Sequence, residues 1–365
     1  MKSKCKYKVD AILFDRDKTE NIQKLVNELK TGTYVMRDYN QFYVYEPKER
    51  LIYAPKFRDK LVQMMVNNAI KHIYQRAFIY DSYACIDGKG THRAADRIQH
   101  FLRKANWQYS GDAYVIKIDI KKYFYSIDRK VLKSLLPKKI KCKQTLELLF
   151  KIIDSSPNEK GLPLGNITSH ILANVYLNEL DNYCKRKLSI KYYVRYMDDA
   201  AIIVNGKERA KEVLSLIKEF LVGKLSLELN EKKSKIFPSK QGINMVGYKI
   251  YKTHKLLRND SKKKVKRKLK KMPGLIASGK MTEDKAEQML NSWLGHARNA
   301  NSYNFVLRLL KRHFYISLEG KRKLNVKIGG VYNAATQRQT IQVVSVESKV
   351  CRPARTTKRK MGFAE

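Results

Sequence analysis

Residues 192–204 read YYVRYMDDAAIIV. Two apolar runs flank the adjacent acids Asp198 and Asp199, so this stretch predicts a β-hairpin with both carboxylates at its tip. Neighbouring carboxylates that lose hydration repel each other, which is costly unless cations neutralise them. Mg²⁺ prefers oxygen ligands and usually binds one or two carboxylates together with substrate phosphates. The alternative interpretation is a polar β-turn, in which Asp is common.

A third acid, Asp119, lies near the end of a second apolar run, AYVIKIDI at residues 113–120, which predicts another strand. If this strand lies beside the hairpin, the three carboxylates supply enough oxygens for two divalent metals about 4 Å apart. One ion would activate the 3′-hydroxyl of a primer and the other would hold a triphosphate, in phosphoryl transfer driven by positioning and charge neutralisation. Mg²⁺ is the expected ion, with Mn²⁺ as the alternative.

The charge of the chain predicts a polyanionic partner. Its 365 residues include 76 Lys and Arg against 34 Asp and Glu, a formal net charge of +42. An excess of this size favours nucleic acid as the partner. An anionic membrane surface is the alternative, but no stretch pairs a basic face with a broad apolar one. No stretch approaches the roughly 18 apolar residues that a membrane span needs, so no membrane partner is expected.

The cysteines and the N-terminus indicate a reducing, cytoplasmic setting. The five cysteines are widely separated and form no CxxC pair, so neither a disulfide framework nor a cysteine zinc site is predicted. The basic N-terminal stretch reaches Asp10 before any useful apolar run, which is not the pattern of a signal peptide.

The apolar spacing along the chain predicts an α+β protein. Helices are expected at 21–30, 57–78, 92–106, over most of 131–154, from the Gly-Pro-Gly loop at 161–165 to 180, and at 207–222, 283–300 and 302–318. Strands are expected within 33–53, at 113–120, on both sides of the paired acids, and as a hairpin at 242–251.

From about Lys48 to Phe305 the chain resembles reverse transcriptases. DIKKYF at 119–124 is similar to their first catalytic-aspartate motif, and YMDD at 196–199 is similar to the second. LSLELNEKKSKI at 225–236 and GINMVGY at 242–248 are similar to the two motifs that follow. The motifs occur in the order of the family, which makes the resemblance specific.

Residues 164–170 (LGNITSH) indicate a branch of this family. Group II intron and retron enzymes usually carry Gln-Gly and Ser-Pro here, whereas enzymes of diversity-generating retroelements carry a hydrophobic residue before Gly and Gln after Ser. The chain resembles the latter at Leu164, Gly165 and Ser169, but His170 replaces the Gln. The resemblance implies that Leu164, Ser169 and His170 support the templating base and its selection, while Gly165 permits close backbone approach to the dNTP. A plain turn before a helix is the alternative. Further similar segments are 50–52, 59–63, 83–85, 90–92, 253–258 and 292–297.

The resemblance implies a right-hand polymerase fold of fingers, palm and helical thumb. Residues 1–112 would form the N-terminal segment and fingers, 113–251 the palm with interleaved fingers elements, 252–320 the thumb and 321–365 a basic tail. The tail would contact RNA or a small accessory protein. Alternatively, it would stay loose and solvated.

The resemblance also implies an RNA-directed DNA polymerase that uses an RNA template, a DNA or RNA primer and dNTPs. Members of this branch copy a template-repeat RNA with frequent errors at adenines, together with a small basic oligomeric accessory protein. The alternatives are another small bacterial reverse transcriptase, of the retron or phage-defence type, and a non-catalytic RNA-binding scaffold. The intact acids argue against the scaffold, because clustered unpaired carboxylates have no structural benefit.

Further residues are expected at the nucleotide. Arg50 and Lys48 match the fingers position that grips the triphosphate, since a guanidinium suits bidentate phosphate contacts; solvated surface charges are the alternative. Ile120 is expected to contact the dNTP. Phe124 matches the aromatic steric gate that excludes a ribose 2′-hydroxyl, with a core aromatic as the alternative.

Two groups of basic residues complete the expected site. Lys235 lies in the motif where polymerases offer a general acid to pyrophosphate, and Lys233 is its rival. A helix over 262–271 would bury only a narrow stripe of Val265, Leu269 and Met272. Its remaining surface would bind nucleic-acid phosphates or stay solvated. The cations expected there are Lys262, Lys263, Lys264, Lys266, Arg267 and Lys268.

Overall fold

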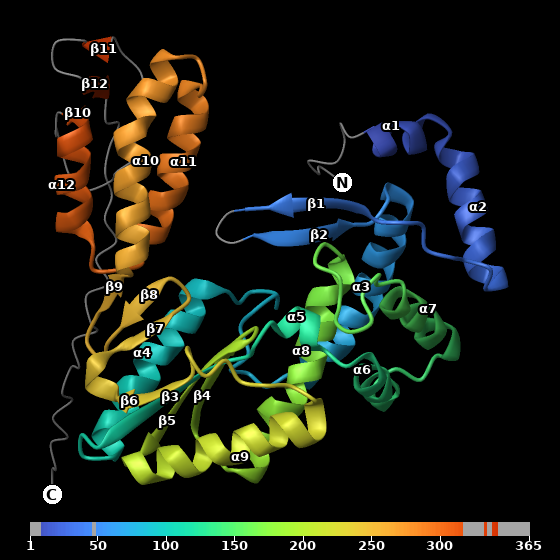
Figure 1. Ribbon diagram of the computed structural model, residues 1–365, viewed down its shortest axis with the longest axis horizontal. Helices are drawn as coiled ribbons and strands as arrows, with labels where there is room; N and C mark the ends of the chain where they lie inside the picture. Colours follow the sequence, from blue (N-terminus) through green and yellow to red (C-terminus); the bar gives the residue numbers. More distant parts are fainter. Residues whose placement is uncertain (1–8, 46–48, 317–331, 334–337, 342–365) are drawn as a thin grey trace, which may run out of the picture. The chain divides into compact units, whose positions relative to one another are not determined.

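The computed structural model describes residues 9–45, 49–316, 332–333 and 338–341 of the chain (Figure 1). The chain divides into two compact units, Met1–Thr253 and His254–Glu365. Antiparallel sheets and helices are mixed in it, which confirms the expected α+β class. None of the helices described combines the length and the apolar character needed to cross a membrane.

A four-stranded sheet forms the centre of the first unit. Its order is β4-β5-β3-β6, and every neighbouring pair is antiparallel. The strands are β4 (Tyr192–Tyr196), β5 (Asp199–Asn205), β3 (Ala113–Asp119) and β6 (Lys235–Pro238). Successive residues such as Val115 and Ile116 point to opposite faces, and both are fully buried. Because both faces are covered, these strands read as continuous apolar runs rather than as an alternating pattern.

Helices supply that cover. α4 (Thr91–Gln108) packs against β4 and β5, and α9 (Lys207–Leu225) packs against β3, β5 and β6. α8 (Ile167–Asn182) contacts α9 and is buried along most of its length. These three helices correspond to expected ones, with ends shifted by a few residues.

The N-terminal part of the first unit carries a hairpin and several helices. β1 (Asn40–Val44) pairs antiparallel with β2 (Arg50–Ala54), and α3 (Phe57–Ala77) packs against α8. The expected helix at 21–30 is α2 (Lys18–Thr31). A preceding helix, α1 (Val9–Arg16), was not predicted, because Ala11 is its only buried residue and it has no apolar stripe to reveal it. The remaining helices here are α5 (Tyr123–Ser126), α6 (Arg129–Leu135), η1 (Leu136–Lys138) and α7 (Lys143–Asp154).

The rest of the first unit consists of short elements. A π-helical turn, η2 (Tyr183–Lys187), follows α8, and a 3₁₀ turn, η3 (Ser239–Gln241), follows β6. The hairpin expected at 242–251 is present as β7 (Ile243–Met245) and β8 (Tyr248–Ile250).

The second unit is mainly helical. It begins with β9 (Lys255–Leu257), and its helices α10 (Asn259–Ala277), α11 (Glu283–Ala297) and α12 (Tyr303–His313) contact one another. The helix expected at 302–318 was wrong at its C-terminal end. β10 (Phe314–Ile316) replaces it, because this segment pairs in parallel with β12 (Arg338–Ile341), which also pairs with β11 (Tyr332–Asn333). The basic tail that begins at residue 321 lies largely outside the described residues.

Candidate active site

The three expected carboxylates come together at one end of the central sheet. In the β3–β5 pair, Asp119 lies directly opposite Asp199. Directly opposed residues in an antiparallel pair have Cβ atoms about 4.5–5.5 Å apart. In the β4–β5 pair, Tyr196 lies opposite Asp199, so Met197 and Asp198 form the two-residue turn of the hairpin. The sheet register therefore brings together the carboxylates of two separate chain segments.

Met197 gives this turn an unusual backbone. Its φ is +57°, in the left-handed region that a residue with a side chain adopts only at a cost of about 1–2 kcal/mol. Its side chain is buried, and its carbonyl oxygen accepts a hydrogen bond of 3.1 Å from Nη1 of Arg195. The turn is therefore held in a strained shape by contacts on its inner side.

Arg195 belongs to a buried network next to the turn. It is 1% exposed, and it donates from Nε and Nη2 to the two carboxylate oxygens of Asp181, at 2.7 and 2.6 Å. Asn174 accepts from Nη1 of Arg195 at 2.9 Å, and Tyr193 donates its hydroxyl to Asp181 at 2.6 Å. A buried ion pair is tolerable only when its remaining polar atoms are satisfied, and here they are. The network fastens α8 to the turn that carries Asp198.

Two lysines reach the carboxylates. Nζ of Lys233 donates to both carboxylate oxygens of Asp119, at 3.0 Å for Oδ1. Nζ of Lys117 forms an ion pair with Oδ1 of Asp199 at 3.2 Å, and that oxygen is buried. Each of these two carboxylates is thus paired with an ammonium group.

Burial is the main influence on the pKa values of two of these acids. Burial raises the pKa of Asp198, and the charge of Asp119 adds to the increase while Lys233 and Arg50 oppose it. Burial also raises the pKa of Asp199 to about 6, despite the opposing charge of Lys117. The raised pKa values mean that burial makes the ionised forms of these two carboxyl groups costly.

The donor set fits a hard divalent cation. Such ions prefer carboxylate oxygens, and the raised pKa values of the two buried acids indicate a place where added positive charge would be stabilising. Within the described residues, no group of three His, Cys, Asp or Glu side chains stands ready to hold a metal ion. Lys233 and Lys117 engage two of the acids, so binding of an ion would have to displace these ammonium groups.

Phe124 and His170 face each other in the first unit. Their ring centroids are 5.7 Å apart, with the ring planes at 82°, and Phe124 also contacts Tyr123 edge-on. Burial lowers the pKa of His170, so its ring is neutral near pH 7. Phe124 is only partly buried, as a side chain that could meet a substrate must be, whereas Tyr123 beside it is buried core.

The loop at 161–165 is held against its neighbours by backbone contacts. The amide of Tyr53 on β2 donates to the carbonyl of Leu164 at 2.7 Å. Gly165 has a φ of +130°, and a Cβ there would clash with the carbonyl oxygen of Tyr53. A Cβ at Gly161 would lie 2.6 Å from the carbonyl oxygen of Phe124. Both glycines are therefore required by close backbone approach, which a simple turn does not demand.

Three other residues expected at the nucleotide or the templating base differ in burial: Ile120 and Ser169 are buried, and Arg50 is exposed. Ile120 is buried and forms a bridge to Leu229. Ser169 is buried and donates its hydroxyl to the carbonyl of Pro163 at 2.8 Å. Arg50 is exposed on β2, and its charge lowers the pKa of Asp198.

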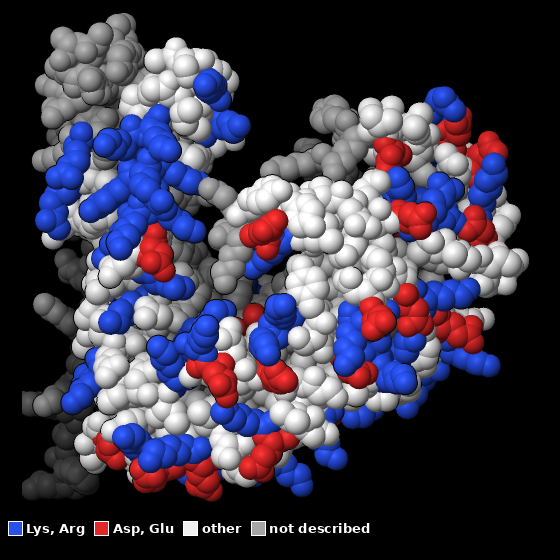
Figure 2. Space-filling model, in the orientation of Figure 1, with Lys and Arg blue, Asp and Glu red and all other residues white. Residues whose placement is uncertain are grey.

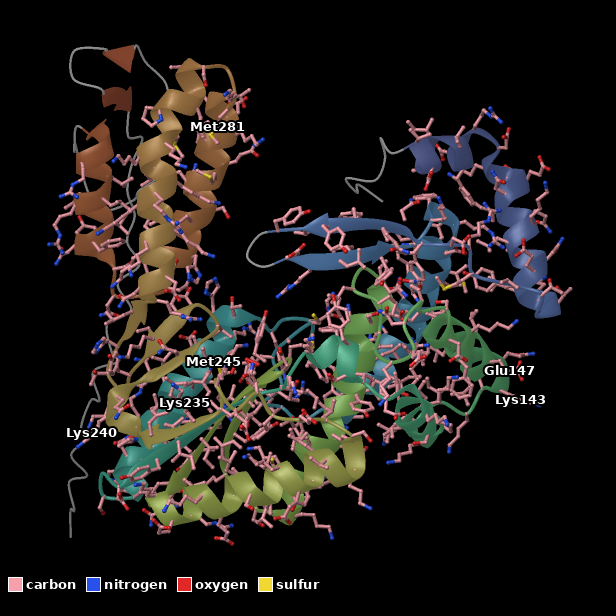
Figure 3. All side chains as sticks on the ribbon, viewed as in Figure 1. Lys143, Glu147, Lys235, Lys240, Met245 and Met281 are labelled. Carbon is pink, nitrogen blue, oxygen red and sulfur yellow. The ribbon has the colours of Figure 1, made fainter. Side chains whose placement is uncertain are left out.

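Two further lysines, Lys48 and Lys235, were expected at the site. Lys48 lies outside the described residues. Lys235, labelled in Figure 3, is exposed on β6 opposite Lys117. It is Lys233, its rival, that contacts Asp119.

The basic run of the second unit lies on α10. Val265, Leu269 and Met272 form its buried stripe, which confirms the expected packing. The cations cover the rest of the helix, and Figure 2 shows Lys and Arg gathered there. Lys262 and Lys266 lie over the ring of Phe305, at 5.6 and 5.7 Å from its centroid. These two cations therefore also help to attach α12.

The buried role of Arg195 next to the turn was not predicted from the sequence. The available signal was a charged residue inside the apolar strand YYVRY, since a buried arginine requires a buried partner. The identity of that partner was not readable, because Asp181 lies on another element.

Comparison with known proteins shows the family to which the chain belongs. The family described as "Reverse transcriptase (RNA-dependent DNA polymerase)" matches residues 44–250. The chain is 27% identical over 304 residues to the "Group II intron-encoded protein LtrA" of Lactococcus lactis subsp. cremoris, covering 63% of this chain and 50% of that protein. It is 26% identical over 283 residues to the "Retron Ec73 reverse transcriptase" of Escherichia coli, covering 73% of this chain and 83% of that protein.

The chain spans about half the length of the Lactococcus protein that it matches. Among solved structures, apo telomerase from Candida tropicalis aligns with a TM-score of 0.49 and 14% identity, covering 76% of this chain and 59% of that one. The family match includes both aspartate motifs and covers more than half of the chain. With its acids aligned on adjacent strands, the chain belongs to the reverse transcriptase family.

Proposed function

We propose that this chain is an RNA-directed DNA polymerase that extends a DNA or RNA primer with dNTPs on an RNA template. The observation that carries the proposal is the register of the central sheet, which sets Asp119 opposite Asp199 and leaves Asp198 in the turn between β4 and β5. Clustered, buried acids are costly, and they are retained where they hold cations for phosphoryl transfer.

Reverse transcriptases generally use divalent metal ions. Here Asp119, Asp198 and Asp199 would hold them, and we propose two Mg²⁺ ions, with Mn²⁺ as the alternative. When bound, the ions would neutralise phosphate charge and activate the 3′-hydroxyl of the primer. The protein contributes the fixed positions of the three carboxylates, since Arg195 and Asp181 lock the turn on its inner side.

Other residues of the first unit would bind the incoming nucleotide. Arg50 and Lys48 would contact the triphosphate, and Ile120 and Phe124 would contact the sugar, with Phe124 excluding a 2′-hydroxyl. Lys233 is better placed than Lys235 to protonate pyrophosphate, because its ammonium already lies in the acid cluster.

The loop around residues 164–170 would bind the templating base, and α10 would bind the nucleic-acid backbone. Leu164, Gly165, Ser169 and His170 would support the templating base, because their loop is fastened to β2. The exposed cations of α10 would contact the nucleic-acid backbone, and that binding should weaken steeply with salt.

The direct test is primer extension on an RNA template with Mg²⁺. Asp198→Ala should reduce the rate by about a hundredfold or more, since removal of a transition-state electrostatic contact commonly costs this much. Glu228→Gln is a matched control, because Glu228 is an exposed acid that pairs with the exposed Lys121. Undiminished extension by Asp198→Ala would refute the proposed site.

We further propose that the enzyme serves a diversity-generating retroelement, with adenine-biased errors and a small basic accessory protein. The support is the sequence at Leu164, Gly165 and Ser169 together with the packing of that loop against β2. The retron relative, of which this chain covers 83%, favours a retron-type enzyme as the second candidate. Sequencing of the cDNA separates the two, because an error rate at adenines no higher than at other bases would support the second candidate.

A further inference from the structure

Trp107 is an exceptionally exposed aromatic residue. It is 85% exposed, the largest exposure among the large apolar side chains that the structure describes. Tryptophan is normally well buried because its ring has a large apolar area. An indole left this open presents its aromatic face to a binding partner, provided that neighbouring groups suit the same partner.

The exposed ring borders a hollow near the C-terminal end of α4. The hollow has a volume of about 510 Å³ and is lined by Arg103, Asn106, Trp107, Lys252 and Thr253. Arg103 and Trp107 are four residues apart on α4, so they lie on the same face of the helix. The amide of Asn106 is fixed by hydrogen bonds to the carbonyl of Leu102, at 2.8 Å, and to the hydroxyl of Ser239, at 3.0 Å. One part of the lining is therefore rigid.

The charge around the hollow has one sign. Its lining contains two cations and no acid, and within the described part of the chain neither Arg103 nor Lys252 forms an ion pair. The exposed Lys104 follows Arg103, and the exposed Lys240 follows Ser239, which is bonded to Asn106. Uncompensated like charges repel one another, and an anionic partner would relieve that repulsion.

The hollow lies at the end of the central sheet opposite to the carboxylates. Ser239, which contacts Asn106, directly follows Pro238, and Pro238 pairs with Tyr114 at the start of β3. Asp119 is at the other end of β3, and strand geometry makes the length of this strand about 20 Å. A ligand in the hollow is therefore not the nucleotide being added.

We propose that the Trp107 hollow binds a single-stranded segment of nucleic acid away from the active site. An exposed aromatic ring stacks on an unpaired base, whose face is open, while neighbouring cations contact its phosphates. A duplex offers no open base faces to the ring. A basic protein is disfavoured by like charge. An acidic protein would have to place an aromatic side chain beside its carboxylates, whereas every nucleotide of a single strand carries a planar base beside a phosphate. The site would anchor a strand entering or leaving the enzyme.

Fluorescence of the full-length chain can test this site. The chain has two tryptophans, so Trp293→Phe leaves Trp107 as the sole reporter. Titration with an oligouridine and with the matching oligodeoxyuridine, without dNTPs, should quench Trp107, and the tighter ligand identifies which kind of strand the site takes. A duplex of the same length should not quench it. Because no catalysis is measured, the result is independent of the proposed polymerase activity.

Binding affinities provide the second measurement. In the chain with both tryptophans, Trp107→Ala should weaken binding of a long single strand about tenfold, and Trp107→Phe should recover part of the loss. Arg103→Ala should lower the slope of log affinity against log salt by about 0.7. Lys224→Ala, which removes an exposed cation from α9, is the charge-matched control for loss of affinity. Primer extension on a short template should stay unchanged in all four variants.

Three results would overturn the proposal. They are an unchanged Trp107 emission at saturating single strand, equal quenching by the duplex, and equal losses of affinity in Arg103→Ala and Lys224→Ala. A change in oligomeric state on Trp107→Ala, seen by sedimentation, would instead identify the hollow as a contact between copies of the chain and would also refute it.

Discussion

Arg195 and Asp181 form a bidentate, fully buried ion pair whose arginine also binds the carbonyl of Met197, in the turn that carries Asp198. Removal of one partner leaves the other charge buried and unpaired. Arg195→Met should therefore lower the free energy of unfolding by about 3–5 kcal/mol, measured by urea denaturation. It should also release the left-handed conformation of Met197 and slow primer extension.

A double variant separates stability from positioning. Arg195→Met combined with Asp181→Leu removes both buried charges, so much of the lost stability should return. The hydrogen bond to Met197 would still be absent, so the rate of extension should stay low. If the rate recovered together with stability, Arg195 would have no role in positioning the turn.

The pKa of Asp199 predicts a dependence of stability on pH. The pKa is raised from 3.8 to about 6, so between these values the native state binds more protons than the unfolded state. Stability should therefore fall as pH rises through this window and then level off, with a loss of about 2 kcal/mol relative to Asp199→Asn. The measurement is denaturation in EDTA at pH 4, 5, 6 and 7. If the free energy of unfolding changed with pH to the same extent in the wild type and in Asp199→Asn, the raised pKa of Asp199 would be contradicted.

Gly165 should not tolerate a side chain. Gly165→Ala places a Cβ against the carbonyl of Tyr53 at a positive φ, and we expect it to lower stability by about 2 kcal/mol and to raise the KM for dNTPs. Gly223→Ala is the matched control, since Gly223 lies within α9 and a Cβ there meets nothing within 4 Å. That change should stabilise the protein by about 0.5–1 kcal/mol. Equal effects of the two substitutions would exclude the close contact with β2.

Phe124 should determine discrimination between deoxyribose and ribose. Phe124→Ala is expected to reduce the preference for dNTPs over ribonucleotides by about tenfold or more, while Phe124→Tyr, which keeps the ring, should preserve it. The measurement is the ratio of kcat/KM values for matched nucleotide pairs. Unchanged sugar discrimination in the alanine variant would remove the gate assignment.

The contact between Phe124 and His170 predicts a second effect. His170→Gln removes the neutral ring that lies edge-on to Phe124, so we expect a changed error rate or error spectrum. Sequencing of cDNA from the variant and the wild type measures both. Identical error profiles would show that His170 has no part in base selection.

Lys233 and Lys235 can be compared directly. Lys233→Met should lower the single-turnover rate of extension by about a hundredfold, because a general acid would be lost. Lys235→Met should have a small effect, since it is Lys233, and not Lys235, that contacts Asp119. If Lys235→Met lowered the single-turnover rate more than Lys233→Met, Lys235 would be the general acid.

Much of the fold was readable because strands buried on both faces and amphipathic helices leave different apolar patterns. β3, β5 and α4 are examples. Two elements, α1 and β10, were not predicted, because the apolar pattern of a segment reflects only its local burial. α1 buries only Ala11 and so shows no stripe, and β10 ends a helical pattern at Phe314 because of a partner strand located further along the chain. Patterns of this kind report local burial and contain no information about distant partners.

The sequence by itself determined the order of the motifs and the presence of Asp198 and Asp199 together at one end of a hairpin, because adjacent residues need no folding to be neighbours. Only the tertiary structure decided that Asp119 faces Asp199, that Lys233 rather than Lys235 touches Asp119, and that Arg195 is neutralised by Asp181. Each of these joins residues far apart in the chain or on different elements. Such pairs form only when packing of the helices against the sheet fixes one register among several that local preferences allow equally.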